Sequence, residues 1–173
     1  AEDLGPAIAA ARRAFDQTSW STDHAFRARC IRQLRDALLE HAEELRATTV
    51  AEVGAPLMLT YGAHQDGPVA DLSFSADLAE SYVWEQDLGT SNVMGISSRR
   101  YTRRQAAGVV AAITPWNFPH QINLAKLGPA LAAGCTVILK AAPDTPWCAS
   151  VLGKLIAEQT EIPPGVVNVI TST

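Results

Sequence analysis

The sequence predicts an α/β fold in which a helical N-terminal segment precedes a βαβαβ unit, the first half of a Rossmann-like doubly wound parallel sheet. Two observations predict it. Apolar residues recur at helical spacing through the first half of the chain. The second half has three short apolar runs, at 109–113, 136–139 and 166–170, which two helical patterns connect. Short apolar strands joined by crossover helices are typical of parallel strands buried on both faces.

Three helices are expected in the N-terminal segment. The first follows Asp3, a candidate N-cap, and continues to about residue 15. The second carries its apolar stripe from 26 to 45, with a break near His41 and an end at Gly54, and the third covers about 68–84. In each of them apolar residues repeat at the spacing of a helix that buries one face.

The segment 96–105, ISSRRYTRRQ, is predicted to be an exposed strand. It lacks a helical period and has four arginines within six residues. Alternate side chains of a strand point to opposite faces, so both faces carry arginine and neither can lie in a core. We interpret the strand as a solvated ribbon or a subunit-contact arm. The net charge of −4 disfavours the alternative, nucleic-acid binding.

The stretch from Gly108 to Lys140 carries the candidate chemistry. An apolar strand at 109–113 is followed by the loop TPWNFP, a helix that ends at Gly134, and a second strand that ends at Lys140. Ligands of such sheets bind at the carboxyl ends of the strands. Thr114, Asn117 and Lys140 are therefore candidate binding residues.

The C-terminal part completes the βαβαβ pattern. Thr145 is a candidate N-cap for a helix that begins at Pro146, the segment Glu161–Gly165 ends this helix, and the third strand covers 166–170. Neither GxGxxG nor GxxxxGK[ST] occurs, so no phosphate-loop motif identifies a nucleotide.

Composition restricts the function classes. The 173 residues are 47% hydrophobic and 18% charged, which is an ordinary globular composition. No apolar run approaches the roughly 20 residues of a membrane helix, and no signal-peptide pattern opens the chain. We expect a cytoplasmic protein without membrane or nucleic-acid partners. Cys30, Cys135 and Cys148 are too scattered for a disulfide framework or a zinc site.

Several segments together resemble the aldehyde dehydrogenase superfamily. They are PWNFP at 115–119, Lys126, PALAAG at 129–134, Lys140 with DTP at 144–146, and PPGVVN at 163–168. The resemblance covers essentially the whole chain. It implies an N-terminal helical part of the cofactor-binding domain at 1–95, a strand of an oligomerisation arm at 96–107, and the incomplete first half of the cofactor-binding sheet at 108–173.

The resemblance also implies an activity. The parent protein would oxidise a small-molecule aldehyde to a carboxylic acid with NAD or NADP, through a cysteine thiohemiacetal, as a homo-oligomer (dimer or tetramer). Asn117 matches the asparagine that stabilises the oxyanion. A fixed amide N–H aimed at the developing charge contributes ~3 kcal/mol. The alternative is that Asn117, between two prolines, only shapes a turn.

Other matching residues have implied roles beside the cofactor. Lys140 would contact the adenosine ribose, and Thr114, Pro115 and Trp116 would border the nicotinamide ribose. The alternatives are a solvated strand-end lysine and a tryptophan that fills the core. Lys126 matches a lysine of a charge relay, and its alternative is plain helix surface.

The helix around Lys126 has a further expected feature. Pro129 leaves the carbonyl of Ala125 without its helical N–H partner, so we expect a kink near Lys126.

One departure concerns the choice of cofactor. After the lysine the family commonly has proline, a small residue and an acid, but here Ala141, Ala142 and Pro143 follow Lys140. Ala142 and Pro143 are candidate cofactor contacts. Pro143 stands where a carboxylate would accept a hydrogen bond from the ribose 2′-hydroxyl, so the choice between NAD and NADP stays open.

The second departure is that no residue matches the family's general-base glutamate or its nucleophilic cysteine. The three cysteines lie in apolar patterns and are expected to act as small apolar residues. We therefore expect this chain alone to be inactive. Two alternatives remain, a truncated non-catalytic assembly or binding module and a cysteine hydrolase that pairs Cys135 or Cys148 with His120.

Overall fold

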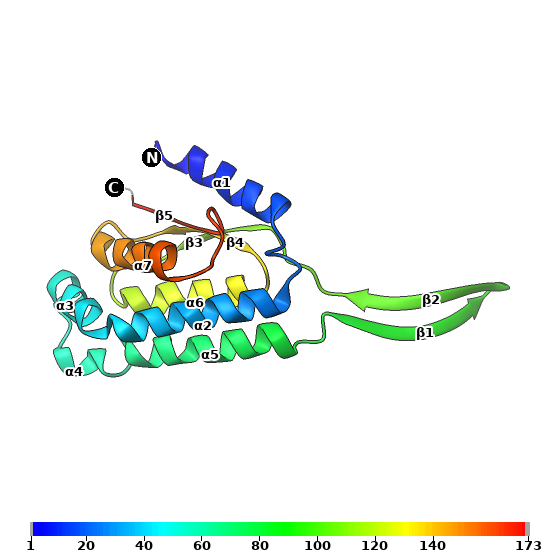
Figure 1. The fold of residues 1–173 in the computed structure, drawn as a ribbon, viewed down its shortest axis with the longest axis horizontal. Helices are drawn as coiled ribbons and strands as arrows, with labels where there is room; N and C mark the ends of the chain where they lie inside the picture. Colours follow the sequence, from blue (N-terminus) through cyan, green and yellow to red (C-terminus); the bar gives the residue numbers. More distant parts are fainter. Residues whose placement is uncertain (1, 172–173) are drawn as a thin grey trace.

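The computed structural model describes residues 2–171. It has a layered body, from which a two-stranded hairpin projects (Figure 1). Across the described residues no helix combines the length and the apolar character needed to cross a bilayer. The expected α/β class and the helical beginning are confirmed.

Five helices form the N-terminal half: α1 (Leu4–Gln17), α2 (His24–Glu40), α3 (Ala42–Val53), the single turn α4 (Leu57–Thr60) and α5 (Asp66–Ser81). The expected break falls at His41, which separates α2 from α3, and α3 ends at Gly54 with a left-handed backbone (φ 68°). The short helix α4 was not expected.

Asp3 and Thr145 stand at the expected N-cap positions, but neither side chain makes a capping hydrogen bond. Asp3 precedes α1 but already has a helical backbone conformation, and its side chain caps no N–H group. Thr145 precedes α7 (Pro146–Gln159), yet its side chain makes no cap hydrogen bond either. The carboxylate of Glu52 accepts hydrogen bonds from the first turn of α7 instead. A residue of a typical capping type at the N-cap position therefore did not determine which group accepts hydrogen bonds from the free N–H groups of the helix.

The hairpin consists of β1 (Glu85–Val93) and β2 (Ile96–Arg103), which pair antiparallel. The exposed strand expected at 96–105 is confirmed but ends at Arg103, whereas its partner β1 was not expected. Arg99 pairs with Asp87 at 2.8 Å and Arg103 with Glu85 at 2.7 Å, so β1 supplies the counter-charges of two arginines.

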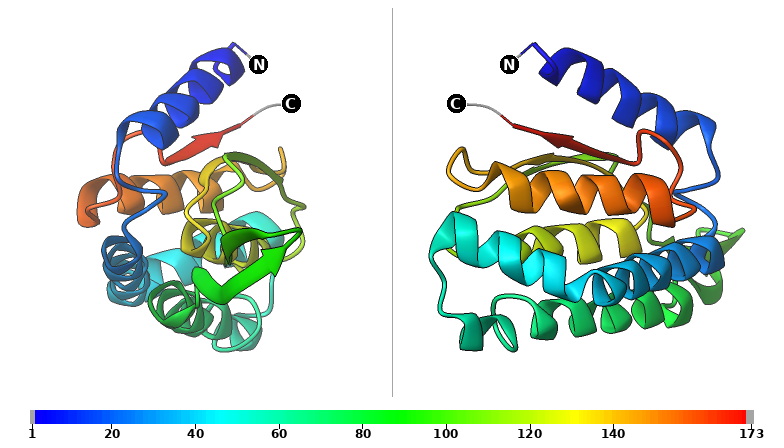
Figure 2. Two further views of the ribbon diagram at one scale, coloured as in Figure 1. Left: turned by 90° about the vertical axis from the view of Figure 1, so that its right-hand side faces the viewer. Right: turned by 60° about the vertical axis from the view of Figure 1, so that its left-hand side comes forward.

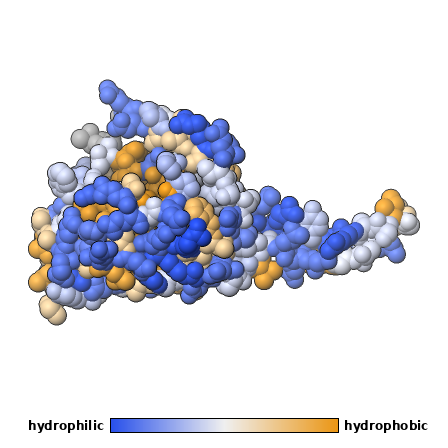
Figure 3. Space-filling view, viewed as in Figure 1, coloured by the Kyte–Doolittle hydropathy of each residue, from blue (hydrophilic) through white to orange (hydrophobic). Residues whose placement is uncertain are grey.

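The far end of the hairpin is apolar. Val93, Met94 and Ile96 are exposed there, Met94 to 97%, and Figure 3 shows the hydrophobic tip in orange. A polar hairpin with an apolar tip presents a surface that water solvates poorly.

The second half forms a parallel sheet of β3 (Val109–Ile113), β4 (Thr136–Lys140) and β5 (Val167–Ile170), in the order β3-β4-β5. The crossover helices α6 (Pro119–Ala132) and α7 cover one face, and α1 covers the other (Figure 2). Helices α2 and α5 form the outer layer against α6 and α7. The strand expected from residue 166 begins at Val167, and its first three residues are half-buried, whereas Ile170 is buried as expected.

Buried polar side chains join the helices to the sheet. The indole N–H of Trp20, which is 0% exposed, donates to the carbonyl of Cys135 at 3.0 Å. Buried Arg27 donates to the carbonyls of Trp20 (2.9 Å) and Ala132 (3.3 Å). A buried donor without a partner destabilises the fold by about 1 to 3 kcal/mol, so these bonds fix how the two halves pack.

Gly165 allows the chain before β5 to pass close to α1. Its φ is +89°, and a Cβ there would lie 2.8 Å from the carbonyl oxygen of Ala10. Gly54 has a similar φ of +68° but open space around it. Both glycines have a left-handed backbone, but only Gly165 lies where a Cβ atom would collide with another segment. Substitutions at the two positions therefore distinguish backbone strain from steric crowding.

We therefore expect Gly165→Ala to lower the thermal unfolding midpoint of the full-length protein more than Gly54→Ala. Both variants place alanine in the left-handed region, which costs about 1 to 2 kcal/mol, but only the first also displaces the Ala10 carbonyl. Differential scanning calorimetry measures both midpoints. Equal midpoints would contradict the close approach.

Candidate functional site

The carboxyl ends of β3 and β4 meet at one edge of the sheet. The backbone N–H of Thr114, directly after β3, donates to the carbonyl of Lys140, the last residue of β4, at 3.2 Å. Thr114 is buried and Lys140 is half-buried. The two predicted residues therefore lie side by side, as parallel strand ends require.

The loop between β3 and α6 presents Asn117 to solvent. Pro115, Trp116 and Asn117 are exposed, and Trp116 is 52% exposed. Trp116 is therefore not a core side chain here. Phe118, the last loop residue, stacks on His64 with ring centroids 4.1 Å apart and the planes inclined by 15°. This stacking attaches the loop to the segment before α5.

The residues of the turn after β4 differ in their exposure to solvent. Ala141 and Ala142 are buried, whereas Pro143 is exposed. Of the two candidate cofactor contacts in this turn, Pro143 offers its side chain to a ligand and Ala142 packs inward. Neither side chain carries a charge, but the next residue, Asp144, is exposed and provides a carboxylate within the same turn.

The structure does not bring Lys126 to this edge. Lys126 is exposed on α6, seven residues after Pro119, where the helix begins. At 1.5 Å per residue, it lies roughly 10 Å along the helix from its start. Helix α6 continues through Pro129 to Ala132. A charge-relay role for Lys126 stays a prediction.

The three thiols are free and buried. Burial raises the pKa of the Cys30 thiol to about 12. Burial, together with the nearby carboxylate of Glu52, also raises the pKa of the Cys148 thiol. A thiol with a raised pKa stays protonated near neutral pH and is a poor nucleophile.

His120 is equally unsuited to activate a thiol. Its burial lowers the pKa of the imidazole to about 4, and among the described residues neither ring nitrogen has a hydrogen-bond partner. A cysteine–histidine hydrolase needs the two side chains in hydrogen-bond contact. These observations argue against the hydrolase alternative.

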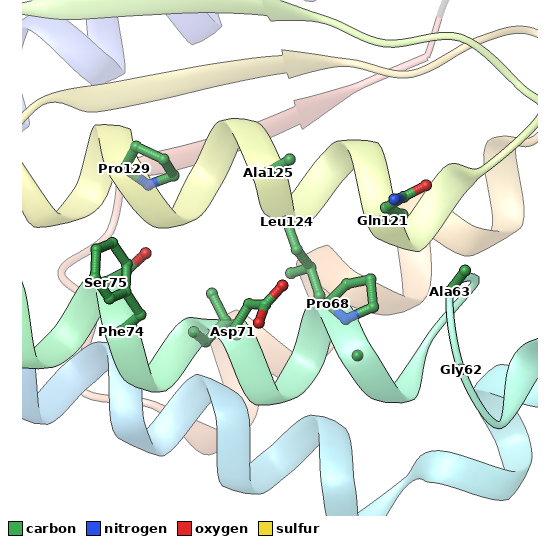
Figure 4. Close-up of a pocket in the computed structure, with 12 residues that line it drawn as sticks. Gly62, Ala63, Pro68, Asp71, Phe74, Ser75, Gln121, Leu124, Ala125 and Pro129 are labelled. Carbon is green, nitrogen blue, oxygen red and sulfur yellow. The ribbon is translucent and has the colours of Figure 1, made fainter.

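A groove of about 530 Å³ lies between α5 and α6. Asp71 and Phe74 of α5 face Gln121, Ala125 and Pro129 of α6 across it (Figure 4). Helix α6 begins two residues after Asn117, so the groove extends along the helix that starts at the candidate site. Sequence reasoning missed it, because no motif marks a groove formed by two packed helices.

Comparison with known proteins identifies relatives along the whole chain. The model of the family described as "Aldehyde dehydrogenase family" matches residues 1–173. A putative aldehyde dehydrogenase, DhaS, from Bacillus subtilis is 36% identical over 173 residues, which are 98% of this chain and 33% of that protein. Geranial dehydrogenase from Castellaniella defragrans is 35% identical over 168 residues, 96% of this chain and 34% of that protein.

Solved structures with the same fold include proteins of both cofactor classes. An aldehyde dehydrogenase from Mycobacterium tuberculosis complexed with NAD+ superimposes with a TM-score of 0.90 at 32% identity, covering 99% of this chain and 34% of that one. An NADP-dependent enzyme from Escherichia coli gives 0.83 at 33% identity, with coverage of 99% and 34%.

The chain thus spans about a third of the length of the relatives that it matches. The family match extends over every residue, and the fold agrees closely with solved members. The chain belongs to the aldehyde dehydrogenase family.

Proposed function

We propose that the protein containing this chain is an NAD- or NADP-dependent aldehyde dehydrogenase that oxidises an aldehyde to a carboxylic acid. The observation that carries the proposal is the exposed Asn117 amide in the loop after β3, at the edge where Thr114 bonds the end of β4. Family membership supplies the reaction class.

The residues at this edge fit a dinucleotide. Lys140 ends the second strand of the βαβ unit, where such sheets place groups that contact a ribose. Trp116 and Pro115 offer exposed apolar surface beside it, and Pro143 offers an uncharged side chain. The bound nicotinamide would accept a hydride. We propose that Lys140 holds the adenosine ribose and that the 114–116 segment borders the other ribose.

Asn117 has the chemistry to stabilise an oxyanion. When a thiolate adds to an aldehyde carbon, the carbonyl oxygen becomes negative, and an amide N–H can donate to it without protonating the thiolate. We propose that a cysteine outside this chain provides that thiolate, because all three thiols here are buried. The isolated chain is then inactive as a dehydrogenase.

We propose further that the β1–β2 hairpin is the oligomerisation arm of a homo-oligomer. Its apolar tip supports this proposal, since such a tip is stabilised when a second subunit covers it. A purely non-catalytic assembly module would use the same tip, and catalysis by the full-length protein separates the two. The dimeric or tetrameric state and the cytoplasmic location stay predictions.

The groove between α5 and α6 is a suitable place for the substituent of the aldehyde. It extends from the Asn117 end of α6, and its walls are mainly apolar or small side chains. Concave sites with few polar groups bind small ligands preferentially. We propose that the carbonyl oxygen lies near Asn117 and that the rest of the substrate lies along α6.

We expect Asn117→Ala in the full-length protein to lower kcat by roughly 10²-fold or more, because one oxyanion donor is lost. The KM for the cofactor should stay close to that of the wild type. Steady-state kinetics with saturating aldehyde give both values. A loss confined to cofactor affinity would overturn the oxyanion role.

Lys140→Ala should have the opposite effect. We expect a higher KM for the cofactor and a smaller change in kcat, because a binding contact is lost rather than one made only in the transition state. Initial rates against cofactor concentration measure both. An unchanged cofactor KM would mean that Lys140 is only a solvated strand end.

Ala125→Trp should fill part of the groove. We expect kcat/KM to fall for long-chain aldehydes by roughly 10-fold or more, the effect of steric exclusion from a pocket, while acetaldehyde is little affected. Ala157→Trp on the exposed face of α7 is the matched control. Equal losses for short and long aldehydes would refute this location of the substrate.

A further inference from the structure

We infer that Glu52, on α3, is a positioning residue for the cofactor-binding edge of the sheet. Its carboxylate occupies the N-terminus of α7 and thereby fixes the turn that follows Lys140. The inference rests on the proposed function, because it concerns the edge at which the cofactor would bind.

The contact joins segments that are distant in sequence. One carboxylate oxygen of Glu52 accepts from the backbone N–H of Trp147 at 2.6 Å, and the other accepts from the N–H of Cys148 at 2.8 Å. The first N–H groups of a helix have no partner within it, and Pro146 at the first position has no N–H at all. Glu52 therefore satisfies the first two donors that α7 possesses.

The carboxylate of Glu52 stabilises the start of α7 rather than its own helix, α3. Glu52 lies in the last turn of α3, which ends at Val53. A negative charge is unfavourable at a helix C-terminus and favourable at a helix N-terminus. In α3 alone this glutamate would be mildly destabilising, whereas beside the start of α7 it is stabilising. Figure 1 shows α3 at the same end of the molecule as the start of α7.

The turn between β4 and α7 is held at three points. The N–H of Ala141 donates to the carbonyl of Ile170 in β5 at 3.3 Å, and the N–H of Thr145 donates back to the carbonyl of Ala142 at 3.2 Å. Glu52 forms the third attachment, at the start of the helix. Without Glu52, the C-terminal end of this five-residue turn would be held in place only through the packing of α7.

The same carboxylate also decides which ligand groups can bind here. A helix N-terminus with unoccupied N–H groups attracts phosphate. At α7 two of these groups already bind an internal anion, so this end of the helix repels a second one. A dinucleotide at this edge would meet Lys140 and the uncharged Pro143, and its phosphates would be bound elsewhere.

The test compares Glu52→Ala, Glu52→Gln and wild type in the full-length protein, with Glu44→Ala as the control. Glu44 lies on the same helix, where it contacts His41. We expect Glu52→Ala to raise the KM for NAD by roughly 10-fold or more, as loss of hydrogen bonds to a charged group would do, and to change kcat less than 3-fold. Glu52→Gln keeps one acceptor and should fall between, while Glu44→Ala should match wild type.

A second readout uses sulfate as a probe. Glu52→Ala leaves the N–H groups of Trp147 and Cys148 unoccupied, so sulfate should raise its thermal midpoint saturably at millimolar concentration, relative to chloride of equal ionic strength. Wild type and Glu44→Ala should show no such difference, because Glu52 fills the site. A plain loss of stability would not produce this anion-specific response.

Three outcomes would overturn the inference. They are an unchanged NAD KM in folded Glu52→Ala, parallel losses in kcat and KM, and the same sulfate response in variant and wild type. If Glu52→Ala does not fold, Glu52→Gln decides by the same criteria. If wild type oxidises no aldehyde, the proposed function fails separately, and NAD titration by fluorescence with the sulfate experiment still decides the role of Glu52.

Discussion

The burial of β4 on both faces is the constraint on which the arrangement of this molecule depends. Helix α1 covers one side of the sheet, and α6 and α7 cover the other. A strand so enclosed carries apolar side chains on both faces, and only Lys140 at its end is partly exposed. Polar side chains that could bind a ligand are therefore confined to the edge of the sheet, where the strands end and the loops begin.

This confinement explains why the candidate residues come from separate loops. Parallel pairing aligns the ends of β3 and β4, so the Asn117 loop and the Lys140 turn reach the same edge of the sheet. Loops on a rigid sheet position functional groups while the core carries the stability. Phe118 and Glu52 add attachments from the helical half, through a ring stack and a helix cap.

The helical half thus does more than cover the sheet. It supplies α5 as one wall of the groove, His64 against the Asn117 loop, and Glu52 at the start of α7. Trp20 and Arg27 fix the packing between the halves through buried hydrogen bonds. The candidate site consequently depends on contacts between residues far apart in the chain, 95 positions for Glu52 and Trp147 and 115 positions for Trp20 and Cys135.

The sequence by itself determined the helices with a strong period, the break at His41, the three parallel strands, and the strand ends at Thr114 and Lys140. These features depend on local hydrophobic periodicity and on residues that stop a helix or strand, which can be read in order along the chain. The family resemblance added the oxyanion role of Asn117, because its residue type between two prolines is by itself more typical of a turn.

Only the tertiary structure decided the partner of the arginine-rich strand, the cap of α7 and the groove. The polar segment 85–93 has no buried face to give it a period, and it pairs because β2 lies beside it. Thr145 had the residue type of a cap, but Glu52 fills that place from 95 residues away. Hydrogen bonds and grooves between distant segments depend on how layers pack, and a local sequence pattern does not encode that packing.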